Sequence, residues 1–193
     1  MVERLCPIYE SDSLGIIAGA GIHWYDNEPY ENIRKIHDMY PDKLIFHTEG
    51  CLEGGPHYDY YEGLERYSRN IIMDMNNFTE AFIDWNLFLD EFGGPNWVGN
   101  YCDAPIMIKD GYIMQYSFYG IAHLAKFIKP GMKRIKLTID NDQLIATSFK
   151  NEHETIIVIL NQTETDYRLN LHGQAQLIKK RSITTFIVEE EDA

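Results

Sequence analysis

Short apolar runs alternate with amphipathic stretches through the first two thirds of the chain. The apolar runs predict buried strands at residues 21–25, 44–48 and 81–87. Apolar residues at helical spacing follow each of them and predict helices at residues 30–40, 64–77 and 116–127. Strand followed by helix, three times over, is typical of a parallel α/β sheet or barrel. The polar stretch Tyr9–Ser13, before the first strand, predicts a loop.

The pattern changes near Lys129-Pro130-Gly131. Beyond it, short β-branched runs recur about every ten residues, which favours a small antiparallel β-sandwich. These runs occupy residues 144–149, 155–160, 167–171, 175–178 and 183–188. We therefore expect two domains, 1–128 with the α/β sheet or barrel and 129–193 with the sandwich.

Composition narrows the classes of function. The 193 residues include 30 acidic and 17 basic side chains, for a net charge of −13. Such a chain repels a phosphate backbone, so we expect no nucleic-acid partner. No apolar run is long enough for a transmembrane segment. The first residues lack the apolar core of a signal peptide. Whether the protein is cytoplasmic or secreted is unknown.

The sequence predicts neither a metal nor another cofactor. Cys6, Cys51 and Cys102 show no paired metal-ligand spacing, and their odd number is not a disulfide framework. The glycines of residues 15–21 lack the lysine and the strand–loop–helix order of a phosphate-binding loop.

Polar and aromatic residues gather where the predicted strands end. Glu49 directly follows the second strand, and barrel active sites lie at the carboxyl ends of strands. An acidic turn residue is the equally open alternative for Glu49. His23 taken alone is more often a core histidine than a catalytic one. Trp85 and its neighbours nevertheless repeat the polar-aromatic ending on the third strand.

Asn27-Glu28-Pro29 matches a string that often marks the acid/base carboxylate of barrel glycosidases. Pro29 also suits the first turn of the helix that follows, and we favour this interpretation. Glu28 is then expected in an exposed loop or first helical turn, away from Glu49.

Five segments together resemble glycoside hydrolase family 30, and its glucosylceramidase-like branch most closely. They are Gly21–Tyr25, Phe46–Cys51, Ile83–Leu87, Gly93–Trp97 and Asn100–Pro105. Their order and spacing agree with the family over essentially the whole chain. The family fold is an eight-stranded (β/α)8 barrel of TIM type joined to a β-sandwich. The resemblance implies that this chain holds the last three βα units of the barrel and most of the sandwich.

The resemblance also assigns roles to individual residues. It implies that Glu49 is the catalytic nucleophile of a retaining glycoside hydrolase. Tyr25, Trp85 and Asn100 match positions that line the sugar subsite. His23 is expected to support these residues from the layer next to the subsite. The implied substrate is a β-glucoside or a related carbohydrate.

The chain departs from the family in length. A complete barrel takes about 250 residues, and the family's acid/base glutamate lies on the fourth strand, which has no counterpart here. Glu28 falls in the loop after the sixth strand and so cannot replace this glutamate. Glu53 lies just past Glu49 and would approach the sugar from the side opposite to the one an acid/base group needs. We expect the isolated chain to be inactive, and to pair with a complementary N-terminal half or self-associate. The alternative is a non-catalytic remnant that serves at most as a carbohydrate-binding or assembly module.

Overall fold

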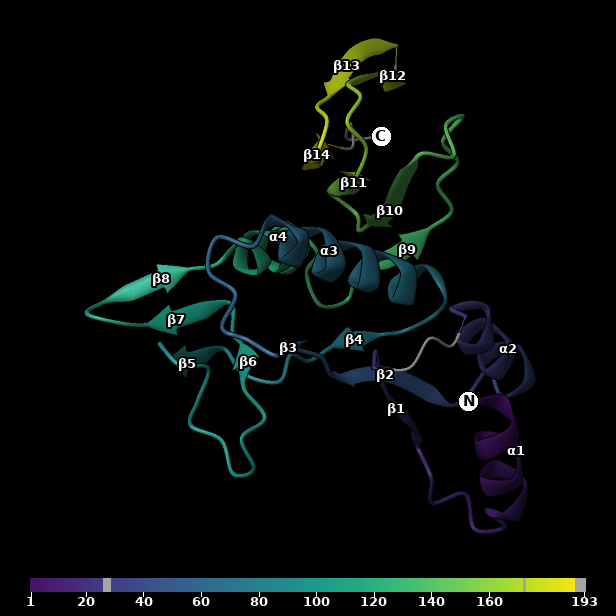
Figure 1. Cartoon of the computed structure of the whole chain (residues 1–193). Coiled ribbons are helices and arrows are strands. Elements are labelled where there is room, and N and C mark those ends of the chain that lie inside the picture. The colour runs from purple at the N-terminus through teal and green to yellow at the C-terminus, as the bar shows by residue number, and fades with distance from the viewer. Residues whose placement is uncertain (26–28, 172, 190–193) are drawn as a thin grey trace. The chain divides into compact units, whose positions relative to one another are not determined.

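The computed structural model describes residues 1–25, 29–171 and 173–189 (Figure 1). The chain forms two compact units whose segments alternate along the sequence. Unit 1 combines Met1–Tyr58 with Met73–Gln115, and unit 2 combines Asp59–Ile72 with Tyr116–Ala193. The domain boundary expected at residues 128 and 129 stays a prediction.

Unit 1 contains a sheet of three parallel strands. They are β1 (Gly19–His23), β2 (Leu44–Glu49) and β4 (Ala81–Phe82), in the order β1-β2-β4. The three predicted strands are therefore neighbours and parallel, as expected. The third is shorter than its apolar run indicated. Beyond Phe82 only irregular hydrogen bonds continue the pairing, from Ile83 N to His47 O and from Trp85 N to Gly50 O.

Two helices cover one face of this sheet. Helix α2 (Glu31–Met39) buries Ile33 and Ile36 against Ile22 and Ile45 of the strands. Helix α1 (Val2–Ser11) adds Tyr9 to the same core. The loop predicted at Tyr9–Ser13 is thus wrong for its first part. The apolar residues of α1 recur at helical spacing, and their packing outweighs the hydrogen bond lost at Pro7.

Two small sheets follow the carboxyl ends of the parallel strands. One pairs β3 (Leu52–Glu53) with β6 (Cys102–Asp103). The other joins β5 (Phe88–Asp90), β7 (Ile106–Ile108) and β8 (Tyr112–Met114). Sequence periodicity did not predict these strands, because two or three residues are too few to show an alternation.

Unit 2 contains the β-sandwich. Its larger sheet has the order β14-β11-β10-β9 and is antiparallel throughout. The strands are β9 (Lys133–Ile135), β10 (Leu144–Lys150), β11 (Glu154–Asn161) and β14 (Ser182–Glu189). A hairpin of β12 (Tyr167–Leu171) and β13 (Gln174–Ile178) supplies Ile178 to the core around Ile157 and Ile159. The five predicted strands are confirmed, and β9 is additional.

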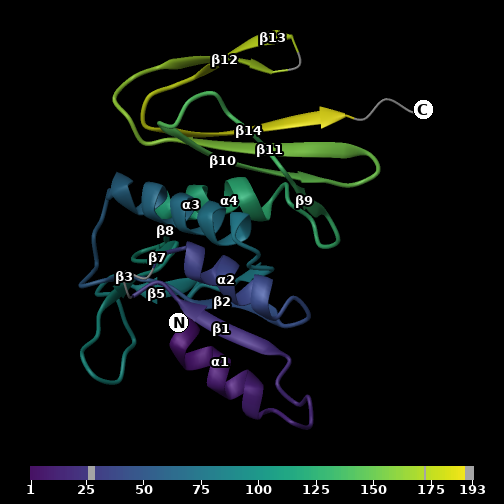
Figure 2. The ribbon, with the colours of Figure 1, turned by 90° about the vertical axis from the view of Figure 1, so that its right-hand side faces the viewer.

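Helices α3 (Tyr61–Asn76) and α4 (Tyr116–Ala125) lie side by side beneath the larger sheet (Figure 2). They approach closely at Gly120, where an added Cβ would lie 2.9 Å from Leu64 O. The His123 ring contacts Thr185 of β14 at 2.9 Å. The part of α3 before Met73 therefore belongs with the sandwich in unit 2.

The architecture is a partial (β/α)8 barrel followed by an antiparallel β-sandwich. Within the described residues the parallel strands form an open sheet and not a closed barrel. Among the helices of these residues, none combines the length and the apolar character that crossing a membrane requires.

Candidate functional site

A shift in strand register determines where the Glu49 side chain lies. Ile22 pairs with His47, but the next residue of β1, His23, pairs with Glu49, so β2 holds one extra residue here, as at a β-bulge. Strict alternation would place Glu49 on the buried face of Ile45 and His47. The extra residue instead sets Glu49 beside the exposed His23.

Glu49 and His23 form a contact at the carboxyl end of the sheet. The distance from His23 Nδ1 to Glu49 Oε1 is 3.6 Å. The Glu49 side chain is 27% exposed, so its carboxylate is accessible while it is partly held. A carboxylate in this position can attack an electrophilic carbon presented from above the strand ends.

A buried pair supports the strand just before Glu49. His47 Nδ1 lies 2.7 Å from Asp74 Oδ2, and both side chains are almost fully buried. The His47 ring also packs on Phe82, with ring centroids 4.4 Å apart, and edge-on against Trp24. Burial raises the pKa of the Asp74 carboxyl, and the contact with His47 opposes that rise. The pair fixes the backbone two residues upstream of Glu49.

Tyr25 lies over the loop that follows Glu49. Its hydroxyl donates to Cys51 Sγ at 3.5 Å, and Trp24 Nε1 donates to Cys51 O at 3.2 Å. Burial raises the pKa of the Tyr25 hydroxyl well above its usual range, and Cys51 and Glu49 add to the effect. Tyr25 is therefore a neutral hydrogen-bonding group at physiological pH.

Trp85 is joined to the loop after β2 by a backbone hydrogen bond, and Asn100 lies close in sequence to a residue that contacts this loop. Trp85 N donates to Gly50 O at 3.0 Å, and its side chain is 54% exposed. Asn100 is exposed two residues before Cys102, whose Sγ lies 2.8 Å from Cys51 Sγ. The five residues expected at the site thus lie on neighbouring segments of unit 1, and their roles stay predictions.

The structure adds a second pair that the sequence had not suggested. His57 N donates to Asp103 Oδ1 at 2.7 Å, and His57 Nδ1 lies 2.9 Å from Asp103 Oδ2. Asp103 is buried at the end of β6, whereas the His57 side chain is 39% exposed. The two residues are 46 positions apart, so their contact leaves no local pattern in the sequence.

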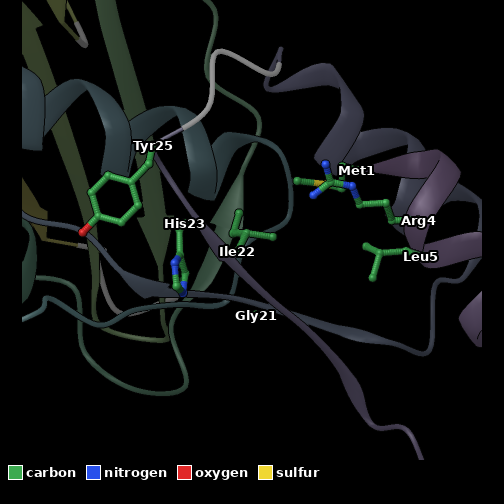
Figure 3. Close-up of a pocket in the computed structure, with 7 residues that line it drawn as sticks. All are labelled: Met1, Arg4, Leu5, Gly21, Ile22, His23 and Tyr25. Atoms are coloured by element: carbon green, nitrogen blue, oxygen red, sulfur yellow. The ribbon is translucent and has the colours of Figure 1, made fainter.

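A hollow of about 470 Å³ opens beside β1. Figure 3 shows His23 and Tyr25 on one side and residues of α1 on the other. The hollow continues from the exposed face of His23 and Tyr25, and Glu49 is not among the described residues that line it. Its lining consists of Met1, Arg4, Leu5, Gly21, Ile22, His23 and Tyr25.

The other acidic candidates differ in position. Asn27 and Glu28 lie outside the described residues, so the expectation for Glu28 stays a prediction. Glu53 is exposed on β3, opposite Cys102. Across the described residues, no cluster of three or more histidine, cysteine or acidic side chains could hold a metal ion.

Solved structures share this arrangement. SrfJ from Salmonella typhimurium matches 97% of this chain with 44% of its own, at 26% identity and a TM-score of 0.88. The endo-β1,6-glucanase BT3312 matches 96% of this chain with 44% of its own, at 26% identity and a TM-score of 0.85.

Sequence comparisons agree. The lysosomal acid glucosylceramidase of Mus musculus is 28% identical over 80% of this chain and 33% of its own length. The chain spans roughly a third of the length of the curated relatives it matches. The sequence model of the glycosyl hydrolase family 30 TIM-barrel domain matches residues 8–128, and that of the family 30 β-sandwich domain matches residues 131–186. The chain belongs to glycosyl hydrolase family 30.

Proposed function

We propose that this chain carries the nucleophile of a retaining β-glycosidase and that Glu49 is this nucleophile. The observation that carries the proposal is the position of Glu49: a partly exposed carboxylate at the carboxyl end of a parallel strand, turned toward His23 by the shift in register. Glucosylceramidase and β-glucanase relatives favour a β-glucoside as the substrate.

The proposed chemistry has two steps. Glu49 attacks the anomeric carbon, the glycosidic C–O bond breaks and its oxygen takes a proton from the acid/base group, which gives a glycosyl–enzyme ester. Water, deprotonated by the same group, then hydrolyses that ester. His23, 3.6 Å from one carboxylate oxygen, orients the group for attack. Tyr25 and Asn100 offer hydrogen bonds to the sugar, and Trp85 offers an exposed aromatic surface.

A retaining pair needs a second carboxyl group about 5–5.5 Å from the first. We assign this acid/base group to a separate barrel segment, whether on the same polypeptide or on another. Losing acid/base assistance costs about 10²–10⁴-fold in rate. The 193 residues alone are therefore expected not to turn over an unactivated β-glucoside.

Mechanism-based labelling tests the role of Glu49. An activated 2-fluoroglucoside has a leaving group that needs little protonation, so the ester can accumulate without a strong acid. Intact-mass measurement should show one glycosyl adduct, mapped to Glu49, when the N-terminal half of a related enzyme is supplied. Without that half, no adduct is expected.

The Glu49→Gln variant is the matched control, because it keeps the size and hydrogen bonding of the side chain. It should give no adduct under either condition. An adduct on another carboxylate would overturn the assignment of Glu49. Turnover by the chain alone, abolished in the Glu49→Gln variant, would show that these residues contain their own acid/base.

A carbohydrate-binding role without catalysis is the second candidate. It is favoured by the aromatic side chains exposed after the strands, since Trp85 is 54% and Trp97 is 97% exposed. Calorimetric titration with a β-glucan distinguishes the two functions. Binding that is lost in Trp85→Ala, unchanged in Glu49→Gln and never followed by labelling would favour the binding module.

A further inference from the structure

Two cysteines meet directly behind the loop that follows Glu49. Cys51 and Cys102 are free thiols with Sγ atoms 2.8 Å apart, and they are 3% and 2% exposed. A disulfide bond measures about 2.05 Å, so bonding requires the sulfur atoms to move by less than about 1 Å. Sequence spacing did not predict this pairing, because 51 residues separate the two positions.

The two cysteines lie in a small core with Leu89, Ala104 and Met107, but the strands beside them are short. Cys51 directly precedes β3 and Cys102 begins β6, and each strand is only two residues long. Gly54 N and Gly55 N both donate to Tyr101 O, at 2.9 and 3.2 Å. Such a short ladder opens locally far more easily than a core strand, which gives a small oxidant access to buried thiols.

We propose that Cys51 and Cys102 are a redox-active dithiol, which a peroxide oxidises to an intramolecular disulfide that fixes the loop after Glu49 against the segment after Asn100. The bond would join the segment that carries the proposed nucleophile to the one that carries a proposed sugar contact. The effect on catalysis rests on the proposed function, whereas the oxidation itself does not.

Cys51 is the thiol that reacts first. Burial raises the pKa of the Cys51 thiol, and the hydrogen bond that Tyr25 donates to its sulfur opposes this rise. At Cys102, burial and the neighbouring Cys51 both act in the same direction and raise the pKa to about 12. The Cys51 thiolate attacks one peroxide oxygen, the O–O bond breaks, and the departing hydroxide takes up the thiol proton, giving water and a sulfenic acid. The Cys102 sulfur then attacks the sulfenic sulfur, and a second water leaves with the Cys102 proton. The two thiols together lose two protons and two electrons, which reduce one peroxide to two waters.

Thiol counting on the full chain tests the oxidation. The chain is treated with hydrogen peroxide, denatured in N-ethylmaleimide and weighed by mass spectrometry. The Cys6→Ser variant should fall from two maleimide adducts to none, and dithiothreitol should restore both. Peptide mapping should show a Cys51–Cys102 link. In the Cys102→Ala variant, dimedone should instead trap a sulfenic acid on Cys51.

Two adducts that persist after peroxide treatment, or separate oxidation of each cysteine without a link, would overturn the proposal.

The effect on the site is read from labelling by the 2-fluoroglucoside in the presence of the N-terminal half. Oxidation should slow labelling of Glu49 in Cys6→Ser, and dithiothreitol should restore the rate. Oxidation should leave the rate unchanged in Cys6→Ser/Cys51→Ala, which lacks the thiol that reacts first. Equal rates before and after oxidation would overturn the regulatory role. Absence of labelling in the reduced protein would overturn the proposed function and that role with it, while the thiol count would still decide the disulfide.

Discussion

Glu49 is partly exposed at the end of a strand in which Ile45 and His47 are buried, and His47 is the last buried residue before it. His47 Nε2 has no hydrogen-bond partner among the described residues, so Asp74 is the only polar support of this buried ring. The buried pair lies two residues upstream of the carboxylate on the same strand. Any loosening there is transmitted through the backbone to Glu49.

Removing the Asp74 carboxylate should destabilise unit 1. We expect Asp74→Ala to lower the free energy of unfolding by about 1–3 kcal/mol, the cost of leaving a buried polar group without a partner. Denaturant unfolding followed by circular dichroism measures the change. The exposed Asp38→Ala on α2 is the matched control and should stay within about 0.5 kcal/mol of the parent. Equal effects of the two substitutions would contradict a supporting role for the pair.

The sequence indicated part of the site and missed the rest for a physical reason. Glu49, Tyr25 and Trp85 were predicted at strand ends, because strand position and side-chain type are both local properties. The shift in register opposite His23 depends on how two strands pair, and the His57–Asp103 pair depends on segments far apart in the chain. Neither has a signature in hydrophobic periodicity.

At the level of elements, β1 and β2 approach so closely that one glycine has no substitute. A Cβ added at Gly19 would lie 2.1 Å from Leu44 O, a backbone atom held in the sheet. A Cβ added at Gly21 would meet the Thr48 side chain at 2.7 Å, and that side chain can rotate away. The same substitution should therefore have unequal effects at two positions of one strand.

We expect Gly19→Ala to cost about 3 kcal/mol of stability, the upper end for overpacking. Gly21→Ala should cost about 0.5–1.5 kcal/mol, because only a side-chain rotamer has to change. Thermal unfolding of both variants measures the difference. The reverse order would mean that β1 does not pair with β2 in the described register.

The contact between α4 and β14 predicts a pH dependence in unit 2. Burial lowers the pKa of His123, whose ring contacts Thr185 at 2.9 Å. The unfolded chain therefore binds this proton more tightly than the folded chain. As the pH falls through the ordinary histidine value of 6.5, the folded state loses stability through this group.

The His123→Gln variant removes that proton-binding step and keeps a group able to hydrogen-bond Thr185. As the pH falls below 7, we expect the free energy of unfolding of the parent to decrease more than that of the variant. Denaturant unfolding at several pH values measures both. A difference that does not change with pH would show that the His123 ring is not buried from water in the folded state.

Most elements could be predicted from the sequence because their apolar residues recur regularly. The sandwich strands β10, β11 and β14 are long enough to show their pattern. The sequence did not predict the pairing of β3 with β6. This pairing depends on where the loops after β2 and β4 place the two strands. The helix α1 has an apolar face, but the polar stretch at its end, Tyr9–Ser13, favoured a loop.

At the level of the whole molecule, the two units interleave in sequence. Residues 59–72 and 116–128 lie with the sandwich strands in unit 2, although the family 30 barrel-domain match runs to residue 128. A fragment cut at the predicted boundary would keep all the strands of the sandwich and lose the α4 contact at Thr185. The two ways of dividing the chain therefore predict different stable fragments.

We expect a fragment of residues 116–193 to unfold at a higher temperature than residues 129–193. The longer fragment keeps α4, whose His123 contacts β14. Thermal unfolding by circular dichroism, together with the dispersion of amide signals in NMR spectra, measures both. Equal melting temperatures would favour the boundary at residues 128 and 129.

Helix α3 contributes residues to both units, and this affects the order of events during synthesis on the ribosome. The first turns of α3 belong to unit 2, but the strands they accompany begin at Lys133 and are made much later. Residues 73–76 of the same helix belong to unit 1, whose strands β1 and β2 have already emerged. Because chains grow at about 5–20 residues per second, the apolar side chains at the start of α3 stay without their partners for several seconds. During that interval they are apolar surface of the kind that aggregates or binds chaperones.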